Sequence, residues 1–258
     1  MKAVIFAGGL GSRLSEETVL KPKPMVEIGG KPIIWHIMKI YSFYGIDEFV
    51  ILCGYKGHII KEYFANYFVR NSDITISLKD NQVEVQNASN VENWKITLVD
   101  TGELTMTGSR LKKARQYIGD DPFLLTYGDG VGDINITKLI KSHRLNSGLV
   151  TMTIAQPDGR FGSVELLDNQ VTSFVEKPKG DGSWINAGFF VCEPAIFDYL
   201  GEGEDVVFEQ DPLCELAQSN NLFSHKHEGF WMPMDTIRDR NILNQLWDDK
   251  KAIWKIWK

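Results

Sequence analysis

The chain has 258 residues, of which 43% are hydrophobic and 24% charged, and its formal net charge is −6. This length and apolar content suffice for one large or two small domains with a substantial core. The negative charge is unlike the broad basic footprint of nucleic-acid-binding proteins, and no apolar run reaches the roughly 18 residues of a membrane span. The three cysteines lie far apart without a CxxC pair, which favours reduced thiols. We therefore expect a cytoplasmic protein with neither nucleic acid nor membrane as a partner.

Strand and helix patterns alternate through the first half. The expected strands share short apolar runs and lie at 2–7, 48–53, 74–78, 83–85, 95–99 and 122–127. The expected helices share apolar residues at helical spacing and lie at 32–44, 56–68 and 107–118, the last capped by Thr107 or Ser109. This order predicts an α/β fold, a Rossmann-like, mostly parallel mixed sheet flanked by helices, with ligands at the carboxyl ends of its strands.

The second half is richer in strands. They are expected at 149–155, 163–167, 171–176 and 184–192, followed by helices at 211–219 and 236–248. Asp168-Asn169 marks a hairpin turn between two of these strands. No stretch rich in Pro, Gly or Ser separates the halves, so we expect one domain over 1–258.

A glycine-rich turn follows the first expected strand, and it consists of Gly8, Gly9, Leu10, Gly11, Ser12 and Arg13. Glycine has no Cβ and accepts positive φ, so such a turn lets backbone N–H groups approach phosphate oxygens. It is neither a Walker A loop nor the G-x-G-x-x-G turn of dinucleotide-dependent oxidoreductases. A tight turn without a ligand would explain the glycines, but it would not explain why Arg13 and the proline-flanked Lys23 follow the same strand. The pattern favours a polyphosphate site.

These two segments resemble a known family, the sugar-1-phosphate nucleotidyltransferases, also called nucleotide-sugar pyrophosphorylases. The family motif G-G-x-G-S/T-R-L, followed by K-P-K-P, is matched without a gap by Gly8–Leu14 and Lys21–Pro24. The likeness continues over nearly the whole chain. It implies that the residues from Gly8 to Ser12 bind a nucleotide and that Arg13 and Lys23 are catalytic residues that hold its phosphates. It also implies that residues 1–130 mainly bind the nucleotide and that the β-rich 131–258 mainly bind a sugar phosphate.

Two aspartates could hold a metal ion. Asp129 follows a buried strand, where a lone carboxylate is costly unless it meets a cation or leaves the core. Asp235 precedes an expected helix. A turn aspartate and a helix cap are the plain alternatives for these two residues. Magnesium held by one or two carboxylates is the usual means of neutralising a triphosphate, and the resemblance implies that both aspartates ligate Mg²⁺.

Two segments of the second half could bind the sugar phosphate. Glu176 and Lys177 end one expected strand, and Asn186 begins the next. Glutamate can accept hydrogen bonds from sugar hydroxyls and lysine can pair with a phosphate, although a solvated Glu–Lys pair would look the same. The family carries an E-K-P and an N-x-G segment in this order, and a short glycine turn like Arg160–Gly162. The resemblance implies that Gly162 and these three side chains line the sugar pocket.

Residues 101–111 bear on the choice of base. Relatives that use UTP or dTTP usually carry a glutamine here, ahead of a Gly-x-Ala helix start, whereas this chain has no such glutamine and places Arg110 at the small position. Arginine can donate to O2 of cytosine, although uracil also has an O2, and a surface arginine in the first turn of a helix is the plain alternative. Resemblance to the members that use CTP, also carried by Gly229–Thr236, implies that Thr105, Arg110 and Gly128 bind the nucleotide.

The resemblance therefore implies an enzyme that transfers CMP from CTP to α-D-glucose 1-phosphate, giving CDP-glucose and pyrophosphate with Mg²⁺ as cofactor. The product would supply deoxysugars for lipopolysaccharide and other cell-surface polysaccharides. Two alternatives stay open: the same reaction with UTP or dTTP, and a non-catalytic regulatory protein that binds nucleotide sugars. Family members are usually homo-oligomers, and the tail 250–258 is expected to pack on its own body or on a neighbouring subunit. Trp247, Trp254 and Trp257 are expected to be exposed aromatics that fit a subunit contact.

Overall fold

The computed structural model describes residues 1–87, 91–157, 159, 162–176, 179 and 183–258. Within them, seven strands form one central sheet, in the order β14 (Leu222–His227), β10 (Val150–Ala155), β13 (Ile185–Cys192), β8 (Phe123–Tyr127), β1 (Ala3–Ala7), β4 (Glu48–Cys53) and β7 (Lys95–Asp100). Strand β13 runs antiparallel to both of its neighbours, and the other pairs are parallel. The predicted mostly parallel mixed sheet is confirmed.

The order of the strands creates a switch point beside β1. The chain runs outward from β1 to β4 and β7, and then returns to place β8 on the other side of β1. Connections therefore leave the carboxyl ends of β1 and β8 in different directions, which opens a crevice where α/β sheets bind ligands. The glycine-rich turn after β1 and Gly128-Asp129 after β8 both lie at this crevice.

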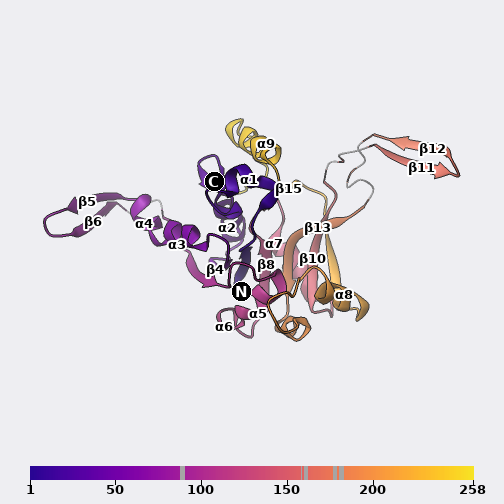
Figure 1. Cartoon of the computed structure of the whole chain (residues 1–258), viewed down its shortest axis with the longest axis horizontal. Coiled ribbons are helices and arrows are strands. Elements are labelled where there is room, and N and C mark those ends of the chain that lie inside the picture. The colour runs from indigo at the N-terminus through magenta and orange to yellow at the C-terminus, as the bar shows by residue number, and fades with distance from the viewer. Residues whose placement is uncertain (88–90, 158, 160–161, 177–178, 180–182) are drawn as a thin grey trace.

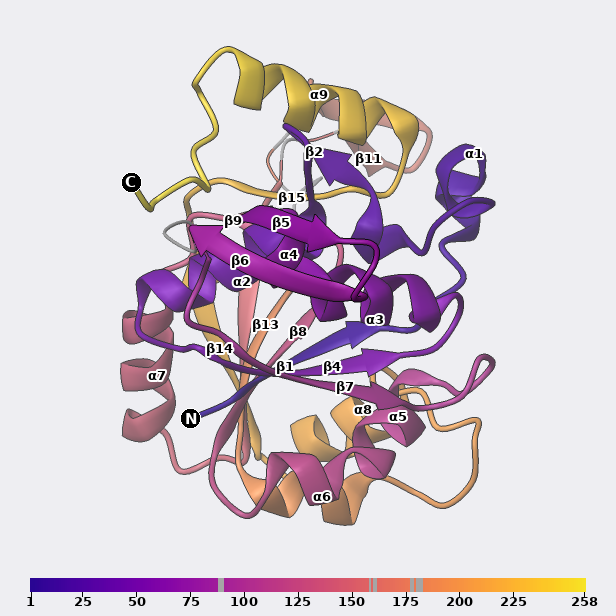
Figure 2. The ribbon, with the colours of Figure 1, turned by 90° about the vertical axis from the view of Figure 1, so that its left-hand side faces the viewer.

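Helices cover both faces of the sheet (Figure 2). Ala3, Ile5 and Ala7 of β1 belong to a hydrophobic cluster with α2 (Ile33–Phe43), α3 (Gly57–Ala65), α7 (Ile136–Leu145) and α9 (Ile237–Asp248). The alternate residues, Val4 and Phe6, belong to a second cluster with α5 (Thr107–Lys113), α6 (Arg115–Ile118), η4 (Pro194–Tyr199) and α8 (Asp211–Gln218). Alternation along a strand thus gives each face its own core.

The helix predictions need three corrections. The helix expected at 56–68 divides at Asn66 into α3 and α4 (Tyr67–Arg70), and the one expected at 107–118 divides at Ala114 into α5 and α6. Neither Thr107 nor Ser109 caps α5, because Met106 is its N-cap residue and makes no side-chain bond there. Helix α7 was not predicted at all. None of the helices in the described part of the chain is long and apolar enough to cross a membrane.

Smaller elements surround the sheet. They are η1 (Ser12–Leu14), α1 (Ser15–Thr18), η2 (Lys23–Met25), β2 (Glu27–Ile28), β3 (Lys31–Pro32), β9 (Gly130–Gly132) and β15 (Trp231–Pro233). Two hairpins, β5 (Asp73–Ser77) with β6 (Gln82–Asn87) and β11 (Ser163–Leu167) with β12 (Gln170–Val175), project from opposite sides of the body (Figure 1). The second confirms the turn predicted at Asp168-Asn169, where Asp168 has a φ of 50°.

The C-terminal tail packs on its own chain. Trp254 is fully buried, and Trp247 and Trp257 lie partly buried against the cluster under α2. The expectation that these tryptophans are exposed is therefore wrong, whereas the expected packing of the tail on its own body is confirmed. Gly29, at φ 57°, lets the backbone pass close against the Trp247 indole, where a Cβ would collide with the ring. At the centre of this cluster lies the fully buried His36.

His36 should make the fold sensitive to acid. Burial lowers the pKa of His36 from 6.5 to about 4. In the unfolded chain the His36 imidazole therefore binds a proton below pH 6.5, whereas in the folded chain it binds one only below about pH 4. The stability that His36 contributes is complete above pH 6.5, and about 2 kcal/mol of it should be lost by pH 5.

Urea unfolding at pH 7 and pH 5 would measure this loss. His36→Gln retains a donor for the Ile28 carbonyl, which His36 Nε2 meets at 2.9 Å, but it cannot titrate in this range. The matched control is His58→Gln, since His58 is exposed on α3. We expect His36→Gln to lose about 2 kcal/mol less than the wild type on acidification, and His58→Gln to behave as the wild type. Equal losses in all three proteins would contradict the assignment.

Candidate active site

The turn after β1 presents unpaired backbone donors. Among the hydrogen bonds between described residues, the N–H groups of Gly9, Leu10 and Gly11 donate to none. Gly11 has a φ of 64°, which glycine adopts without strain, and its carbonyl accepts from Leu14 N at 2.9 Å. Gly9 has open space where a Cβ would stand. A row of free N–H groups beside a strand end can receive phosphate oxygens.

Lys23 lies at the centre of the site. Its ammonium contacts a carboxylate oxygen of Asp129 at 2.7 Å and one of Asp235 at 2.6 Å, and its side chain is only 11% exposed. Burial alone would lower the pKa of Lys23, but the two carboxylates outweigh it and raise that pKa above its usual 10.5. Lys23 is therefore a fixed positive charge at neutral pH.

Backbone contacts bring the two aspartates together. Gly128 packs so closely against the Phe6 carbonyl that a Cβ there would clash, so β8 ends tightly beside β1. The Asp129 carbonyl then accepts from Met234 N at 2.8 Å, which places the next residue, Asp235, beside Asp129. The cap alternative for Asp235 does not hold, because Thr236 caps α9 in a capping box with Asp239.

Arg13 completes the charged group. Its guanidinium contacts the other carboxylate oxygen of Asp235 at 2.8 Å, yet 73% of its side chain is exposed. Two cations and two carboxylates thus surround the open end of the turn. Arg13 can swing toward a ligand at little cost because it is held by one exposed ion pair.

The two carboxylates suit a hard divalent cation. Magnesium is usually bound through one or two carboxylates plus substrate phosphates and waters, and Asp129 and Asp235 are placed so that they could supply the carboxylates. Within the residues that the structure describes, no group of three or more His, Cys, Asp or Glu side chains could hold a metal ion. A metal here would therefore complete its coordination with waters or substrate oxygens.

A cavity of about 450 Å³ opens beside these charges. It is lined by Phe6–Arg13, Lys23, Pro24, Glu103–Thr107, Arg110 and Tyr127–Asp129. Leu10, Leu104 and Met106 are 51%, 77% and 46% exposed and line the same cavity, so together they offer an apolar surface on which a flat group could pack. The size and the mixed lining suit a nucleotide with its base near these residues and its phosphates near Lys23.

Arg110 joins two loops at the back of this cavity. Its guanidinium is buried and donates to the carbonyls of Gly8, Gly102 and Glu103 at 3.0, 2.6 and 3.0 Å. A Cβ on Gly8 would collide with it. The plain alternative of a surface arginine is thus excluded, and Arg110 is committed to shaping the loops that line the cavity.

Thr105 anchors the loop before α5. Its hydroxyl bonds the Glu204 carboxylate and accepts from the Lys113 ammonium at 3.1 Å. The same Lys113 also pairs with Glu204 at 2.7 Å. Thr105 lines the cavity while its side-chain oxygen holds the segment that carries Glu204.

The predicted sugar residues are only partly brought to this cavity. Asn186 reaches it indirectly, because its Nδ2 lies 3.2 Å from the hydroxyl of the lining residue Tyr127. Gly162 and Glu176 lie at the base of the β11–β12 hairpin, where a Cβ on Gly162 would stand 3.2 Å from a Glu176 oxygen, and neither lines the cavity (Figure 1). Lys177, Arg160 and Phe161 lie outside the described residues.

Sequence reasoning missed several residues of this site. Tyr127 precedes the predicted Gly128-Asp129 directly, and Thr107 lies two residues after Thr105, so proximity to predicted residues could have pointed to both. Glu204 and Glu209 carry no such signal. They belong to the second half of the chain, and only the fold brings them beside α5.

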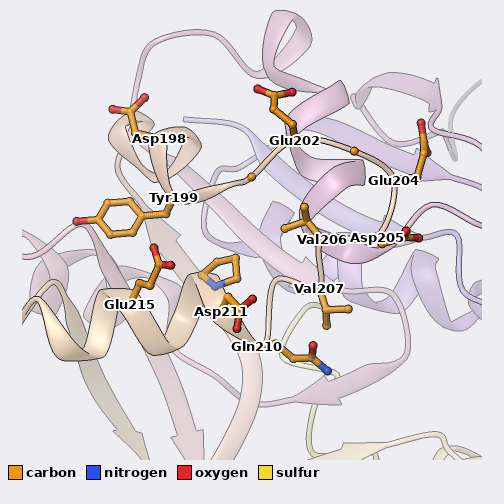
Figure 3. A pocket seen from close by; sticks show the side chains of 13 residues that line it. Asp198, Tyr199, Glu202, Glu204, Asp205, Val206, Val207, Gln210, Asp211 and Glu215 are labelled. Carbon is orange, nitrogen blue, oxygen red and sulfur yellow. The ribbon is translucent and has the colours of Figure 1, made fainter.

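A second cavity lies between η4, α8 and the segment that joins them (Figure 3). It measures about 470 Å³, and its acidic lining residues are Asp198, Glu202, Glu204, Asp205, Asp211 and Glu215. No lysine or arginine is among its described lining residues, so it would repel a polyphosphate. The cavity beside Lys23 is therefore the candidate active site.

Comparisons with known proteins agree on the family. The model of the nucleotidyl transferase family matches residues 2–239. A glucose-1-phosphate cytidylyltransferase from Salmonella typhimurium is 55% identical to this chain over 258 residues, and a probable glucose-1-phosphate cytidylyltransferase from Bacillus subtilis is 45% identical over 257 residues. Each match covers 100% of this chain and 100% of the relative.

A solved structure shares the fold at lower identity. A putative glucose-1-phosphate thymidylyltransferase from Bacillus anthracis superposes on this chain with a TM-score of 0.71 at 18% identity. The match covers 100% of this chain and 98% of the thymidylyltransferase chain. At that identity the likeness concerns the fold alone. With the family match and the two full-length relatives, it follows that this chain belongs to the nucleotidyl transferase family.

Proposed function

We propose that this protein transfers CMP from CTP to α-D-glucose 1-phosphate, forming CDP-glucose and pyrophosphate. The observation that carries the transfer chemistry is the Lys23 ammonium, held between Asp129 and Asp235 beside a turn of free N–H groups. The choice of substrates is supported by the names of the relatives that are 55% and 45% identical over their full length.

The reaction needs no protein nucleophile. A phosphate oxygen of glucose 1-phosphate, already an anion at neutral pH, would attack the α-phosphorus of CTP in line as the bond to the β-phosphate breaks and pyrophosphate leaves. Catalysis then depends on position and charge. Lys23 would bind the α-phosphate and the incoming phosphate, and the exposed Arg13 would bind the departing β- and γ-phosphates.

Asp129 and Asp235 would hold Mg²⁺, which when bound neutralises phosphate charge and orients the phosphate oxygens. The N–H groups of the turn after β1 would bind phosphate oxygens, and Leu10, Leu104 and Met106 would cover the base. Arg110 would serve the nucleotide chiefly by fixing the loops around it, because five hydrogen bonds already engage its guanidinium. Glu176, Lys177, Asn186 and Gly162 stay predictions for the sugar phosphate. The division into halves at residue 130 stays a prediction too.

The test is a panel of CTP, UTP, dTTP and ATP, each with glucose 1-phosphate and Mg²⁺, scored by pyrophosphate release and by identification of the nucleotide sugar. We expect CTP to be preferred by kcat/KM, and no product in the presence of EDTA. Preference for UTP or dTTP would replace the proposed base. Binding of CDP-glucose without turnover of any triphosphate would favour a regulatory protein.

We also propose a homo-oligomer, with the hairpins as contacts between subunits. Leu166, Leu167 and Phe174 on β11–β12 are 61%, 65% and 63% exposed, and Leu78 beyond β5 is 90% exposed. An isolated two-stranded hairpin is marginally stable in water, and clustered apolar exposure marks an interaction surface. Light scattering should give a multiple of the 29.3 kDa chain mass, and Phe174→Lys should lower it. A monomeric mass for the wild type would contradict this.

A further inference from the structure

Glu209 connects two walls of the candidate active site without lining it. It lies in the segment between η4 and α8, part of which appears in Figure 3, and is partly buried. One carboxylate oxygen accepts from the Thr107 hydroxyl at 2.6 Å, and the other accepts from the Tyr127 hydroxyl at 2.7 Å. Thr107 begins α5 on the side expected to bind the base, and Tyr127 stands two residues before Asp129.

The hydrogen bonds continue from Tyr127 to Asn186. The Tyr127 hydroxyl accepts from Asn186 Nδ2 at 3.2 Å, and Asn186 Oδ1 accepts from Gly188 N at 2.8 Å. Because a backbone N–H can only donate, the Asn186 atom that faces Gly188 must be the oxygen, and the amide nitrogen must then face Tyr127. Among the bonds between described residues, the second hydrogen on that nitrogen makes none, so it could be donated to a ligand.

The direction of these bonds requires an anion at Glu209. Tyr127 accepts from Asn186, and Thr107 accepts from Phe208 N at 2.9 Å, so both hydroxyl hydrogens are left to be donated. A carboxylate accepts at both oxygens, whereas an amide of the same shape would turn an N–H₂ group toward one hydroxyl. That hydroxyl would then face two donors and lose the acceptor for its own hydrogen.

The ring of Tyr127 is held separately from its hydroxyl. It stacks on Phe6 with ring centroids 5.8 Å apart and meets Phe190 edge-on at 6.0 Å. Gly188, at φ 77°, packs against the same ring, where a Cβ would collide. Tyr127→Phe should therefore keep the packing and remove only the hydrogen bonds.

We propose that Glu209 is a positioning residue that, through Tyr127, orients Asn186 toward the sugar of the bound nucleotide sugar. The series Asn186 to Tyr127 to Glu209 ends on a carboxylate, which together with the donor at Gly188 N fixes the orientation of every member. This inference rests on the proposed function, because it takes Asn186 as part of the sugar side of the site.

The kinetic test compares Glu209→Gln, Tyr127→Phe and the double variant. The matched control is Glu202→Gln, since Glu202 belongs to the same segment but is 92% exposed and pairs with Lys112. We expect each single variant to lose about five- to tenfold in kcat/KM for glucose 1-phosphate, the size of one hydrogen bond, with KM for CTP nearly unchanged. The double variant should lose no more than the worse single, because the two residues act in series.

A binding measurement separates positioning from a general loosening of the site. Titration calorimetry with CDP-glucose and with CDP should show weaker binding of CDP-glucose alone in Glu209→Gln and Tyr127→Phe. Equal losses for both ligands, multiplicative losses in the double variant, or no loss would overturn the proposal. If Glu209→Gln does not fold, the affinities of Tyr127→Phe for CDP-glucose and for CDP distinguish between the same outcomes.

Failure of the proposed function is recognised separately. If the wild type instead prefers UTP, CTP is not its substrate, and the same proteins are compared on UDP and UDP-glucose. A loss confined to the sugar conjugate then supports the role of Glu209, and an equal loss on both ligands overturns it.

Discussion

Lys23→Met should lower kcat/KM by at least about 10²–10³, because a preorganised charge at the reacting phosphate contributes this much to transition-state stabilisation. Methionine retains most of the aliphatic stem and removes the ammonium that lies 2.7 Å from Asp129 and 2.6 Å from Asp235. The measurement is steady-state pyrophosphate release with each substrate varied. Thermal unfolding would check that the variant remains folded.

Lys21→Met is the matched control for this prediction. Lys21 belongs to the same K-P-K-P segment, but it pairs with Glu27 at 3.5 Å and does not line the cavity. Its replacement should change turnover by less than about threefold, as expected for a surface ion pair. If Lys23→Met turned over within threefold of the wild type, Lys23 would have no part in the reaction.

Asp129→Asn should cost a similar factor, about 10²–10³ in kcat, and should also raise the Mg²⁺ concentration needed for half-maximal activity. Asparagine keeps the size of the side chain and the backbone bond from Met234 N, so the fold should persist. It removes one of the two carboxylates available to the metal. The measurement is a Mg²⁺ titration of turnover at saturating substrates.

The control is Asp121→Asn, an exposed aspartate just before the opposite end of β8. It should leave both turnover and the Mg²⁺ titration unchanged. The two charge variants should differ in one respect. Lys23→Met removes a cation that competes for the same carboxylates, so it should not raise the Mg²⁺ requirement, whereas Asp129→Asn should. An unchanged Mg²⁺ titration in Asp129→Asn would remove that residue from the metal site.

Much of the fold could be predicted from local patterns. The strands at Ala3–Ala7 and Glu48–Cys53 and the hairpin at Asp168-Asn169 appear where apolar runs and turn residues indicated them. Helix divisions at Asn66 and Ala114 could not be predicted, because apolar spacing continues across both residues while the backbone there leaves regular α-helical geometry.

The burial of the tryptophans and the hydrogen bonding of Arg110 also depend on residues far away in the sequence. Trp254 looked available for a subunit contact, yet it is buried beside His36, more than two hundred residues away in the chain. Arg110 looked like a direct reader of the base, yet carbonyls from two separate loops and from Cys53 at the end of β4 surround it. Nothing near either residue in the sequence indicates such partners.

The sequence by itself determined the glycine-rich turn after the first strand, the cations that follow it and the family, because these depend on the backbone freedom of glycine and on residue types at short spacing. Only the tertiary structure decided that Asp235 meets Asp129 across Lys23, and that Glu209 bridges Thr107 and Tyr127. The physical reason is that a charge or hydroxyl acts over a few ångströms. Which residues come that close is decided by how the strands and helices pack, and short stretches of sequence do not carry that information.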